Sequence, residues 1–146
     1  MWEELTKQLR DILTANTLLP AVYTFETAEY DGDPFATITP SGNENDFDTT
    51  TENERVYAFV VRLFKERSGE TQPEDAEAAM RELVDSVLDD FDKNWQLSNV
   101  ATPTGYDFLY MEAAPSAWGY VDRETQIRIA EITIRCHLHI DTQLIS

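Results

Sequence analysis

The run of residues 56–64 is apolar on both of its alternating faces, and it constrains the fold more than any other segment. One set of alternate positions carries Tyr57, Phe59, Val61 and Leu63, and the other carries Val56, Ala58, Val60, Arg62 and Phe64. Successive side chains of a strand point to opposite faces of a sheet, so both faces of this strand need a cover. The run therefore predicts a central strand, with helices over one face and another layer, such as a second subunit, over the other.

Two segments carry apolar residues at helical spacing. In the first they are Trp2, Leu5, Leu9, Ile12 and Leu13, and Asn16 followed by Pro20 marks the end of the helix. The second segment starts with the capping-box pattern Thr71-Gln-Pro-Glu74 and continues to about Lys93. Its apolar face consists of Ala76, Met80, Leu83, Val84, Val87, Leu88 and Phe91. Both segments are predicted to be amphipathic helices that pack on the sheet.

Shorter apolar runs predict four further strands, at residues 22–25, 35–39, 106–111 and 127–140. In the last of these, Ile127 and Ile129 are out of phase with the alternation that follows, which predicts a bulge near Ala130. The order of elements is then α-β-β-β-α-β-β. It predicts an α+β fold, in which two helices flank one mainly antiparallel sheet. A chain of 146 residues has the size of one domain, so residues 1–146 are expected to form a single one.

The stretch between the second and third strands, residues 41–54, is polar and acidic, with Phe47 as its one large apolar side chain. Fixing a backbone costs about 1–2 kcal/mol per residue, whereas burial of Phe47 would return about 1.5–3 kcal/mol. Long loops of this kind are usually disordered or bind a partner. The stretch is therefore expected to be a loop that becomes ordered on a partner. Its carboxylates are those of Glu44, Asp46, Asp48, Glu52 and Glu54.

The chain has 28 acidic and 11 basic residues, for a formal net charge of −17. Proteins bind nucleic acids and anionic membranes largely by neutralising phosphates with Lys and Arg, so this composition argues against both kinds of ligand. Acidity is concentrated in the loop above and in residues 70–92. Two interpretations stay open: ordinary solubility, or a surface past which a polyanion slides without binding.

Cys136 is the only cysteine and lies in an alternating strand pattern, so no disulfide is expected and a reducing cytoplasm is the predicted compartment of folding. The amino terminus lacks the charge and apolar pattern of a secretion signal, and no run approaches the ~18 apolar residues of a membrane span. We therefore expect a soluble protein that is neither exported nor inserted in a membrane.

The sequence carries none of the common catalytic motifs, because it has no Gly-rich phosphate loop, nucleophile elbow or His-Glu-x-x-His pattern. No catalytic residue and no cofactor are predicted. His137 and His139 share a strand face and could bind zinc, but a closed zinc site needs four ligands, so a solvated face is favoured. Asn43, Asn45 and Glu54 partly match a calcium loop, yet Asp48 stands where its glycine is required; an EF-hand is excluded, and only weak cation binding stays open.

The loop expected after residue 111 contains Trp118-Gly119-Tyr120. Two aromatic residues around a glycine either fill the local core or present anchors to a partner. Both interpretations stay open for Trp118 and Tyr120.

A set of motifs follows one order along nearly the whole chain. It comprises the turn with Pro34, the strand Phe35-Ala-Thr-Ile-Thr39, Asp46-Phe47, Asn53-Glu-Arg-Val-Tyr57, Phe64-Lys-Glu-Arg67, the helix of residues 74–92, Trp118-Gly-Tyr-Val-Asp-Arg-Glu124 and Ala130-Glu-Ile-Thr-Ile-Arg135. In this arrangement the chain resembles the tail-terminator, or tail-completion, proteins of long-tailed bacteriophages.

The resemblance implies a structural virion protein with no catalytic step. Such proteins form a homohexameric ring that caps the tail tube, stops its polymerisation and presents a docking surface for the head, while DNA passes through the lumen. The implied partners are other copies of the chain, the tail tube protein and a head-completion connector. The implied location is the tail or neck of the virion, after assembly in the host cytoplasm.

The candidate interface residues under this hypothesis are Phe47, Trp118, Tyr120 and Arg123, and the acidic residues 44–54 would face the lumen or the tube. Three alternatives stay open. The chain could be a neck or head-completion connector, an acidic DNA mimic that binds a DNA-binding protein, or a small enzyme whose cleft no motif reveals.

Overall fold

The computed structural model describes residues 1–25, 32–47, 49, 51–66, 73–98, 100–120 and 127–145. Its elements are α1 (Trp2–Thr14), β1 (Ala21–Tyr23), β2 (Phe35–Phe47), β3 (Glu52–Glu66), α2 (Pro73–Lys93), β4 (Tyr106–Tyr120) and β5 (Ile127–Asp141). This order confirms the predicted α+β fold. Thr71, at the start of the predicted capping box, lies outside the described residues.

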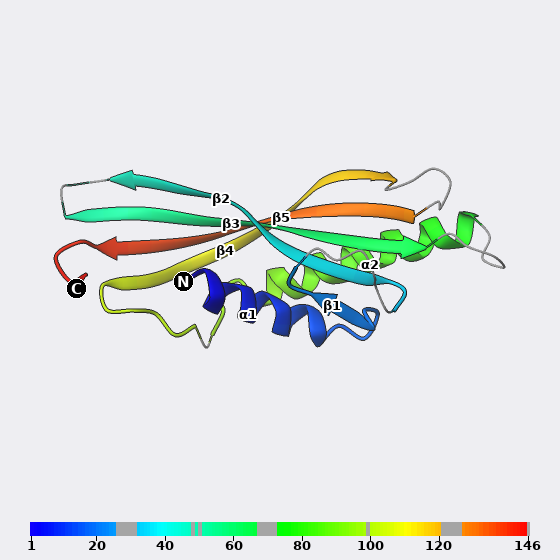
Figure 1. Ribbon diagram of the computed structural model, residues 1–146, viewed down its shortest axis with the longest axis horizontal. Coiled ribbons are helices and arrows are strands. Elements are labelled where there is room, and N and C mark those ends of the chain that lie inside the picture. The colour runs from blue at the N-terminus through cyan, green and yellow to red at the C-terminus, as the bar shows by residue number, and fades with distance from the viewer. Residues whose placement is uncertain are drawn as a thin grey trace.

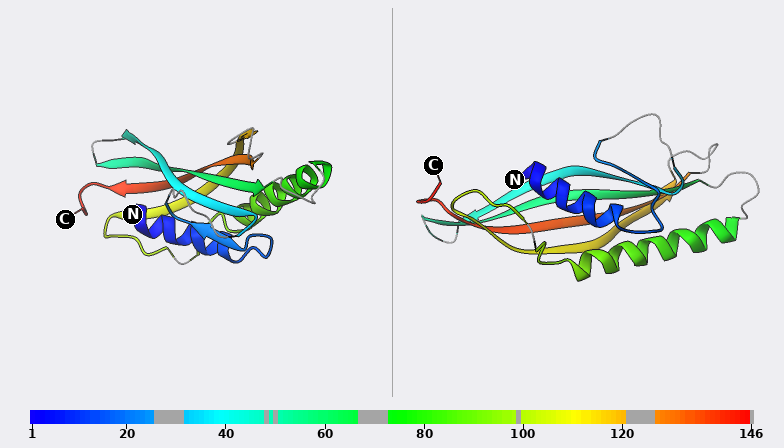
Figure 2. Two further views of the ribbon diagram at one scale, coloured as in Figure 1. Left: turned by 45° about the vertical axis from the view of Figure 1, so that its right-hand side comes forward. Right: turned by 90° about the horizontal axis from the view of Figure 1, so that it is seen from below.

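The five strands form one sheet in the order β1-β2-β3-β5-β4. The pair β1–β2 is parallel and the other three pairs are antiparallel. The run that is apolar on both faces is β3, and it lies at the centre, as predicted. Both helices lie on the same side of the sheet, and the opposite face carries no described helix (Figures 1 and 2). No described helix is long and apolar enough to cross a membrane.

The core lies between the helices and one face of the sheet. On that face Phe59 pairs with Ile134 and Val61 with Ile132, and all four side chains are fully buried. The helices add Leu5, Leu9, Leu13, Met80, Val87 and Phe91 to the same cluster. Cys136 is also fully buried there, and burial raises the pKa of its thiol to about 12. The thiol therefore stays protonated and unreactive.

The two helices are joined by one buried polar residue, Asn16, just past the end of α1. Its side-chain amide donates hydrogen bonds to Ser86 Oγ at 3.0 Å and to Asp90 Oδ2 at 2.7 Å, both on α2. Its Oδ1 accepts a hydrogen bond from the backbone N–H of Leu18 at 2.8 Å. The residue that the sequence suggested as a helix stop thus also sets the contact between the helices.

The acidic stretch at residues 41–54 is a β-hairpin, so the predicted loop is wrong. Its first part belongs to β2 and its last part to β3, with Asp46 paired to Glu54. At the turn, the backbone N–H groups of Thr51 and Glu52 donate to Thr49 Oγ1 at 3.3 and 3.1 Å. β3 is also paired with β5 to its very start, where Glu52 faces Asp141. Hydrogen bonds of the strand ladder therefore offset the cost of ordering this stretch, which burial of Phe47 alone could not offset.

Polar side chains add to the order of this hairpin on the helix side of the sheet. Asn45 Oδ1 accepts hydrogen bonds from Asn53 Nδ2 at 3.0 Å and from Arg55 Nε at 2.7 Å. Arg55 Nη1 also donates to Tyr106 Oη on β4 at 2.9 Å. These contacts link β2, β3 and β4 at this end of the sheet. The side chains of Asp46 and Phe47, and the whole of Asp48, lie outside the described residues.

Residues 112–120 are likewise strand and not loop, because β4 runs on to Tyr120 against β5. Register shifts occur between Phe108 and Tyr110 and between Pro115 and Ala117. The bulge predicted near Ala130 is wrong, since β5 pairs with β3 without interruption. Ile129 is out of phase because it lies on the face away from the helices, opposite Phe64. Phe64 stacks there on Phe35 at 4.6 Å, so this end of that face is apolar.

Candidate functional site: the uncovered face of the sheet

The face of the sheet away from the helices is the candidate interaction surface, and we call it the uncovered face. At its middle lie Ala58 and Val60 of β3 and Thr133 of β5, all partly exposed. The sequence predicted a second layer over this face, and none is present among the described residues. Charged and polar residues surround the small central side chains. The face is therefore partly apolar at its middle and charged around it.

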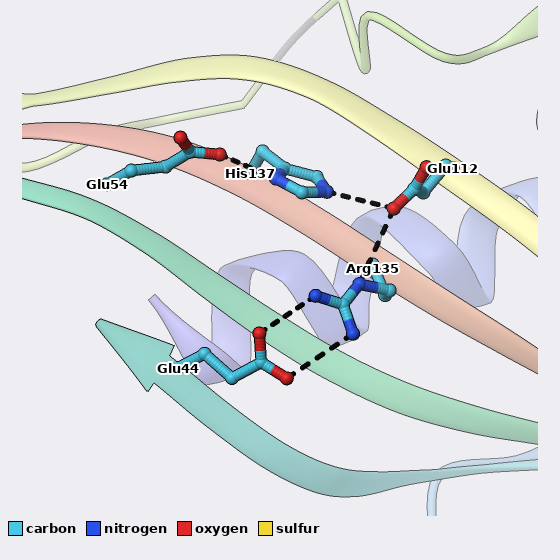
Figure 3. A network of polar contacts seen from close by, with 5 residues as sticks. All are labelled: Glu44, Glu54, Glu112, Arg135 and His137. Carbon is cyan, nitrogen blue, oxygen red and sulfur yellow. Dashed lines mark hydrogen bonds and ion pairs between the residues drawn. The ribbon is translucent and has the colours of Figure 1, made fainter. Parts of the chain in front are cut away.

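One cluster of charges on the uncovered face joins the four strands β2, β3, β4 and β5 (Figure 3). Arg135 of β5 binds Glu44 of β2 through two hydrogen bonds, Nη2 to Oε2 at 2.8 Å and Nη1 to Oε1 at 3.3 Å. The Nε of Arg135 lies 3.4 Å from Glu112 Oε1 on β4. The hydrogen bonds that Arg135 donates to Glu44 raise the pKa of Arg135 above its usual value. Arg135 faces Ala58 on the intervening strand, and this small side chain leaves room for the guanidinium to reach β2.

His137 belongs to the same cluster and is only 7% exposed. Its Nδ1 lies 2.8 Å from Glu54 Oε1 and its Nε2 lies 3.1 Å from Glu112 Oε1. Its ring stacks on Tyr110 at 4.2 Å. The expectation of a solvated histidine is therefore wrong for His137, since both ring nitrogens face carboxylates. Among the described residues, no group of three or more His, Cys, Asp and Glu side chains could hold a metal ion.

A second ion pair lies on the same face toward the opposite end of the strands. Arg62 Nε donates to Glu131 Oε1 at 3.0 Å, and Arg62 Nη1 donates to Thr39 Oγ1 at 3.3 Å. Both arginines described on this face, Arg62 and Arg135, are thus bound by carboxylates. These carboxylate partners weaken the attraction of either arginine for a phosphate group.

Trp118 is the predicted interface residue whose side chain the structure describes. Trp118 lies on the helix side of β4, is 43% exposed and has the guanidinium of Arg128 5.2 Å from its ring centre. Arg128 in turn donates to Glu77 of α2 at 2.9 Å. Trp118 is therefore not a core residue, and its role in an interface stays a prediction. The side chains of Phe47 and Tyr120, and all of Arg123, lie outside the described residues.

Of the predicted acidic residues, Glu44 and Glu54 lie on the uncovered face, and Glu52 lies beside His139, at 3.9 Å from Nε2 to Oε1. The sequence reasoning missed that Arg135 and His137 bind these carboxylates. Arg135 and His137 alternate with the buried residues of β5, and this alternation already indicated that both lie on the same face. The carboxylates that they bind are set by strand pairing, which could not be predicted while residues 41–54 were taken as a loop.

The two edges of the sheet differ in how they are covered. β1 pairs only with Phe35–Thr37, so the rest of β2 has no strand neighbour on that side among the described residues. β4 forms the other edge, where the backbone N–H of Met111 donates to the carbonyl of Trp95 at 2.8 Å. The pairings make β2 and β4 antiparallel to each other. If β4 of one copy lay beside β2 of the next, the antiparallel order would therefore continue.

Comparison with known proteins shows a likeness of fold to a solved structure. No protein-family model matches this chain, and no curated protein matches it by sequence. A chain from a solved structure, described as the virion of the native gene transfer agent (GTA) particle, has a similar fold with a TM-score of 0.58 and 15% sequence identity. The likeness covers 92% of this chain and 94% of that one. The two chains share a fold over nearly their whole lengths.

The hairpin at residues 41–54 makes a prediction for hydrogen exchange. Amide hydrogens of β3 at residues 53–57, where the strand is paired on both sides, should exchange on the order of 100-fold more slowly than those of Thr49 and Thr51 in the turn. Exchange followed by NMR on the free protein measures this directly. Uniformly fast exchange from residue 41 to residue 57 would contradict the hairpin and restore the mobile loop.

Proposed function

We propose that this chain is a structural virion protein that assembles into a ring at the end of a phage-like tail tube. The ring ends tube polymerisation, presents a docking surface to the head and lets DNA pass through its lumen. The proposal includes no catalytic step. Its main support is the sheet itself: β2 and β4 run in opposite directions, and among the described residues β2 beyond Thr37 and the outer side of β4 have no further strand neighbour. The likeness to a chain of the GTA virion supports a place in a phage-like particle.

The strand directions favour head-to-tail contacts between copies. Pairing β4 of one copy with the outer edge of β2 in the next would extend one antiparallel sheet from copy to copy. Contacts of this heterologous kind generate a closed ring when the rotation between copies closes. Both helices lie on one face (Figure 2), and this bulk is accommodated more readily outside a closed sheet than inside it. The uncovered face would then line the lumen.

The charges of the uncovered face suit a channel for DNA. Glu44, Glu112 and Glu131 hold both of its described arginines in ion pairs, and the chain as a whole has a net charge of −17. Non-specific affinity for DNA depends on releasing counterions from phosphates by free Lys and Arg. A lumen with paired arginines and an excess of carboxylates would therefore pass DNA without retaining it.

Ring formation is tested with purified protein by mass measurement and negative-stain electron microscopy. We expect closed rings, of six subunits by the resemblance, whose population rises with salt. Added salt shortens the Debye length from about 10 Å at 0.1 M to about 3 Å at 1 M and so weakens repulsion between acidic copies. A protein that stays monomeric at all salt concentrations and also fails to bind tube ends would contradict the proposal.

The edge contact has its own measurement. On ring formation, amides of residues 41–47 in β2 should become protected, while those at the centre of β3, already paired in the monomer, should change little. If rings form without new protection in β2, the pairing of β2 with β4 of the next copy is wrong, but the proposal of a ring stands. A stable complex of a monomer or dimer with a basic DNA-binding protein would instead favour a DNA mimic, and binding at the head alone would favour a connector.

A further inference from the structure

Arg55 differs from the other arginines that the structure describes. Each of those pairs with a carboxylate: Arg10 with Asp11, Arg62 with Glu131, Arg81 and Arg128 with Glu77, and Arg135 with Glu44. Arg55 instead donates to uncharged oxygens, which are Asn45 Oδ1 at 2.7 Å, Tyr57 Oη at 3.3 Å and Tyr106 Oη at 2.9 Å. Although the chain has 28 acidic residues, no carboxylate among the described residues pairs with this guanidinium.

Arg55 lies on the helix side of β3, at a place that the helices leave open. Trp2, the first residue of α1, packs edge-on against Tyr57 with 4.9 Å between ring centres. Arg55 lies on the same face, two residues closer to the hairpin turn, and this end of the sheet extends past the start of α1 (Figures 1 and 2). Arg55 is only partly buried, and Asn45 beside it is exposed. A partner can therefore reach the guanidinium from outside.

Two phenol groups add hydrogen-bond donors beside the guanidinium. The oxygens of Tyr57 and Tyr106 accept hydrogen bonds from Nη1 of Arg55, so their own O–H hydrogens point elsewhere. No described residue accepts either hydrogen, although Tyr57 is only 5% exposed and a buried donor without an acceptor is costly. The hydrogen bond to Tyr57 raises the pKa of Arg55 above its usual value, so the charge is permanent. The site offers a fixed positive charge and two hydroxyl donors.

We propose that Arg55, Tyr57 and Tyr106 bind the carboxylate of an aspartate or glutamate on a partner protein. Nη2 of Arg55 has no hydrogen-bond partner among the described residues. A carboxylate has two oxygens, so one can accept from this nitrogen while the other accepts from a phenol O–H. A nucleic acid is a poorer ligand, because a single guanidinium on a chain of net charge −17 does little to neutralise its phosphates.

The partner is inferred to be a different protein, and this step rests on the proposed edge pairing between copies. The described acidic residues of β4 are Asp107 and Glu112, which lie opposite His139 and Arg135 on the uncovered face. Arg55 pairs with the buried Leu138 on the other face. A copy joined through β2 and β4 would therefore present its β4 carboxylates on the wrong side of the sheet to reach Arg55.

The test adds a blocked tripeptide, with glutamate between two glycines, to the free ¹⁵N-labelled chain at constant ionic strength. NMR follows the Nε–H signal of Arg55 and the backbone amides of Tyr57 and Tyr106. We expect saturable shifts at millimolar peptide, and none from the same peptide with glutamine in place of glutamate. This comparison needs no variant of the chain.

Variants then locate the site, with the backbone amide of residue 106 as the probe. Arg55→Gln should weaken binding of the glutamate peptide by about tenfold or more, and Tyr106→Phe should weaken it by about threefold. The matched control Arg10→Gln removes the same charge from an exposed position of α1 and should change binding less than about twofold. Equal weakening by Arg55→Gln and Arg10→Gln would overturn the proposal, because net charge alone would then govern binding.

Other outcomes would overturn the proposal as well. Equal shifts from the two peptides, or shifts that do not saturate, would show that no carboxylate site exists. Tighter binding of inorganic phosphate than of the glutamate peptide would point to a nucleic acid. Shifts at Arg55 that follow protein concentration without peptide would point to a second copy of the chain. The peptide measurements use the free chain at low concentration, so their outcome is independent of whether rings form.

Discussion

Replacing Phe59 by alanine is expected to lower the free energy of unfolding by about 3–5 kcal/mol. Phe59 is fully buried at the centre of β3, and the ring of Trp2 on α1 meets it edge-on at 5.1 Å. The alanine variant leaves a cavity between the sheet and α1. Because small domains are stable by only about 5–15 kcal/mol, the loss should be plain in urea unfolding followed by circular dichroism.

The neighbouring residue supplies the control. Val60 lies on the uncovered face and is partly exposed, so Val60→Ala should cost about 1 kcal/mol or less in the monomer. The comparison therefore distinguishes the two faces of one strand. Equal losses from the two substitutions would mean that the uncovered face is already buried in solution, as it would be under a second layer.

Asn16→Ala should destabilise the protein by about 1–3 kcal/mol, although it removes few atoms. The substitution removes the hydrogen bond that Asn16 donates to Asp90 and the one that it accepts from the N–H of Leu18. Both lie at a buried junction between the helices. Thermal unfolding measures the effect, and Thr17→Ala, at an exposed position one residue further on, is the control. A change no larger than that of the control would show that Asn16 does not join the helices.

Periodicity in the sequence was enough to predict both helices and the central and last strands. Their patterns are set by burial on one face, as at Leu5 and Leu9 in α1, and burial is encoded locally in the choice of apolar residues. The central place of β3 followed from its two apolar faces. These elements contain most of the core, so the fold class could be predicted from the residues alone.

The two missed strand segments have little intrinsic preference for strand. Gly42, Asn43 and Asn45 in β2, and Pro115 in β4, are residue types that are depleted in strands. They are held in the sheet by register with β3 and β5, which continue past them. The charged cluster was missed for the same reason, because Glu44 meets Arg135 across β3. Tertiary pairing, and not local propensity, determines both features.

The bulges of the edge strands bear on how far assembly can proceed. β2 has one register shift at Pro40/Gly42, and β4 has two, the second beside Pro115. A bulge bends its strand and increases the local twist, and an edge proline lacks the N–H that a neighbouring strand would need. Such edges disfavour pairing with a flat strand of another protein and growth into a straight fibril. In the proposed assembly they limit growth, because only a copy with matching curvature can pair and each added copy turns the sheet further toward closure.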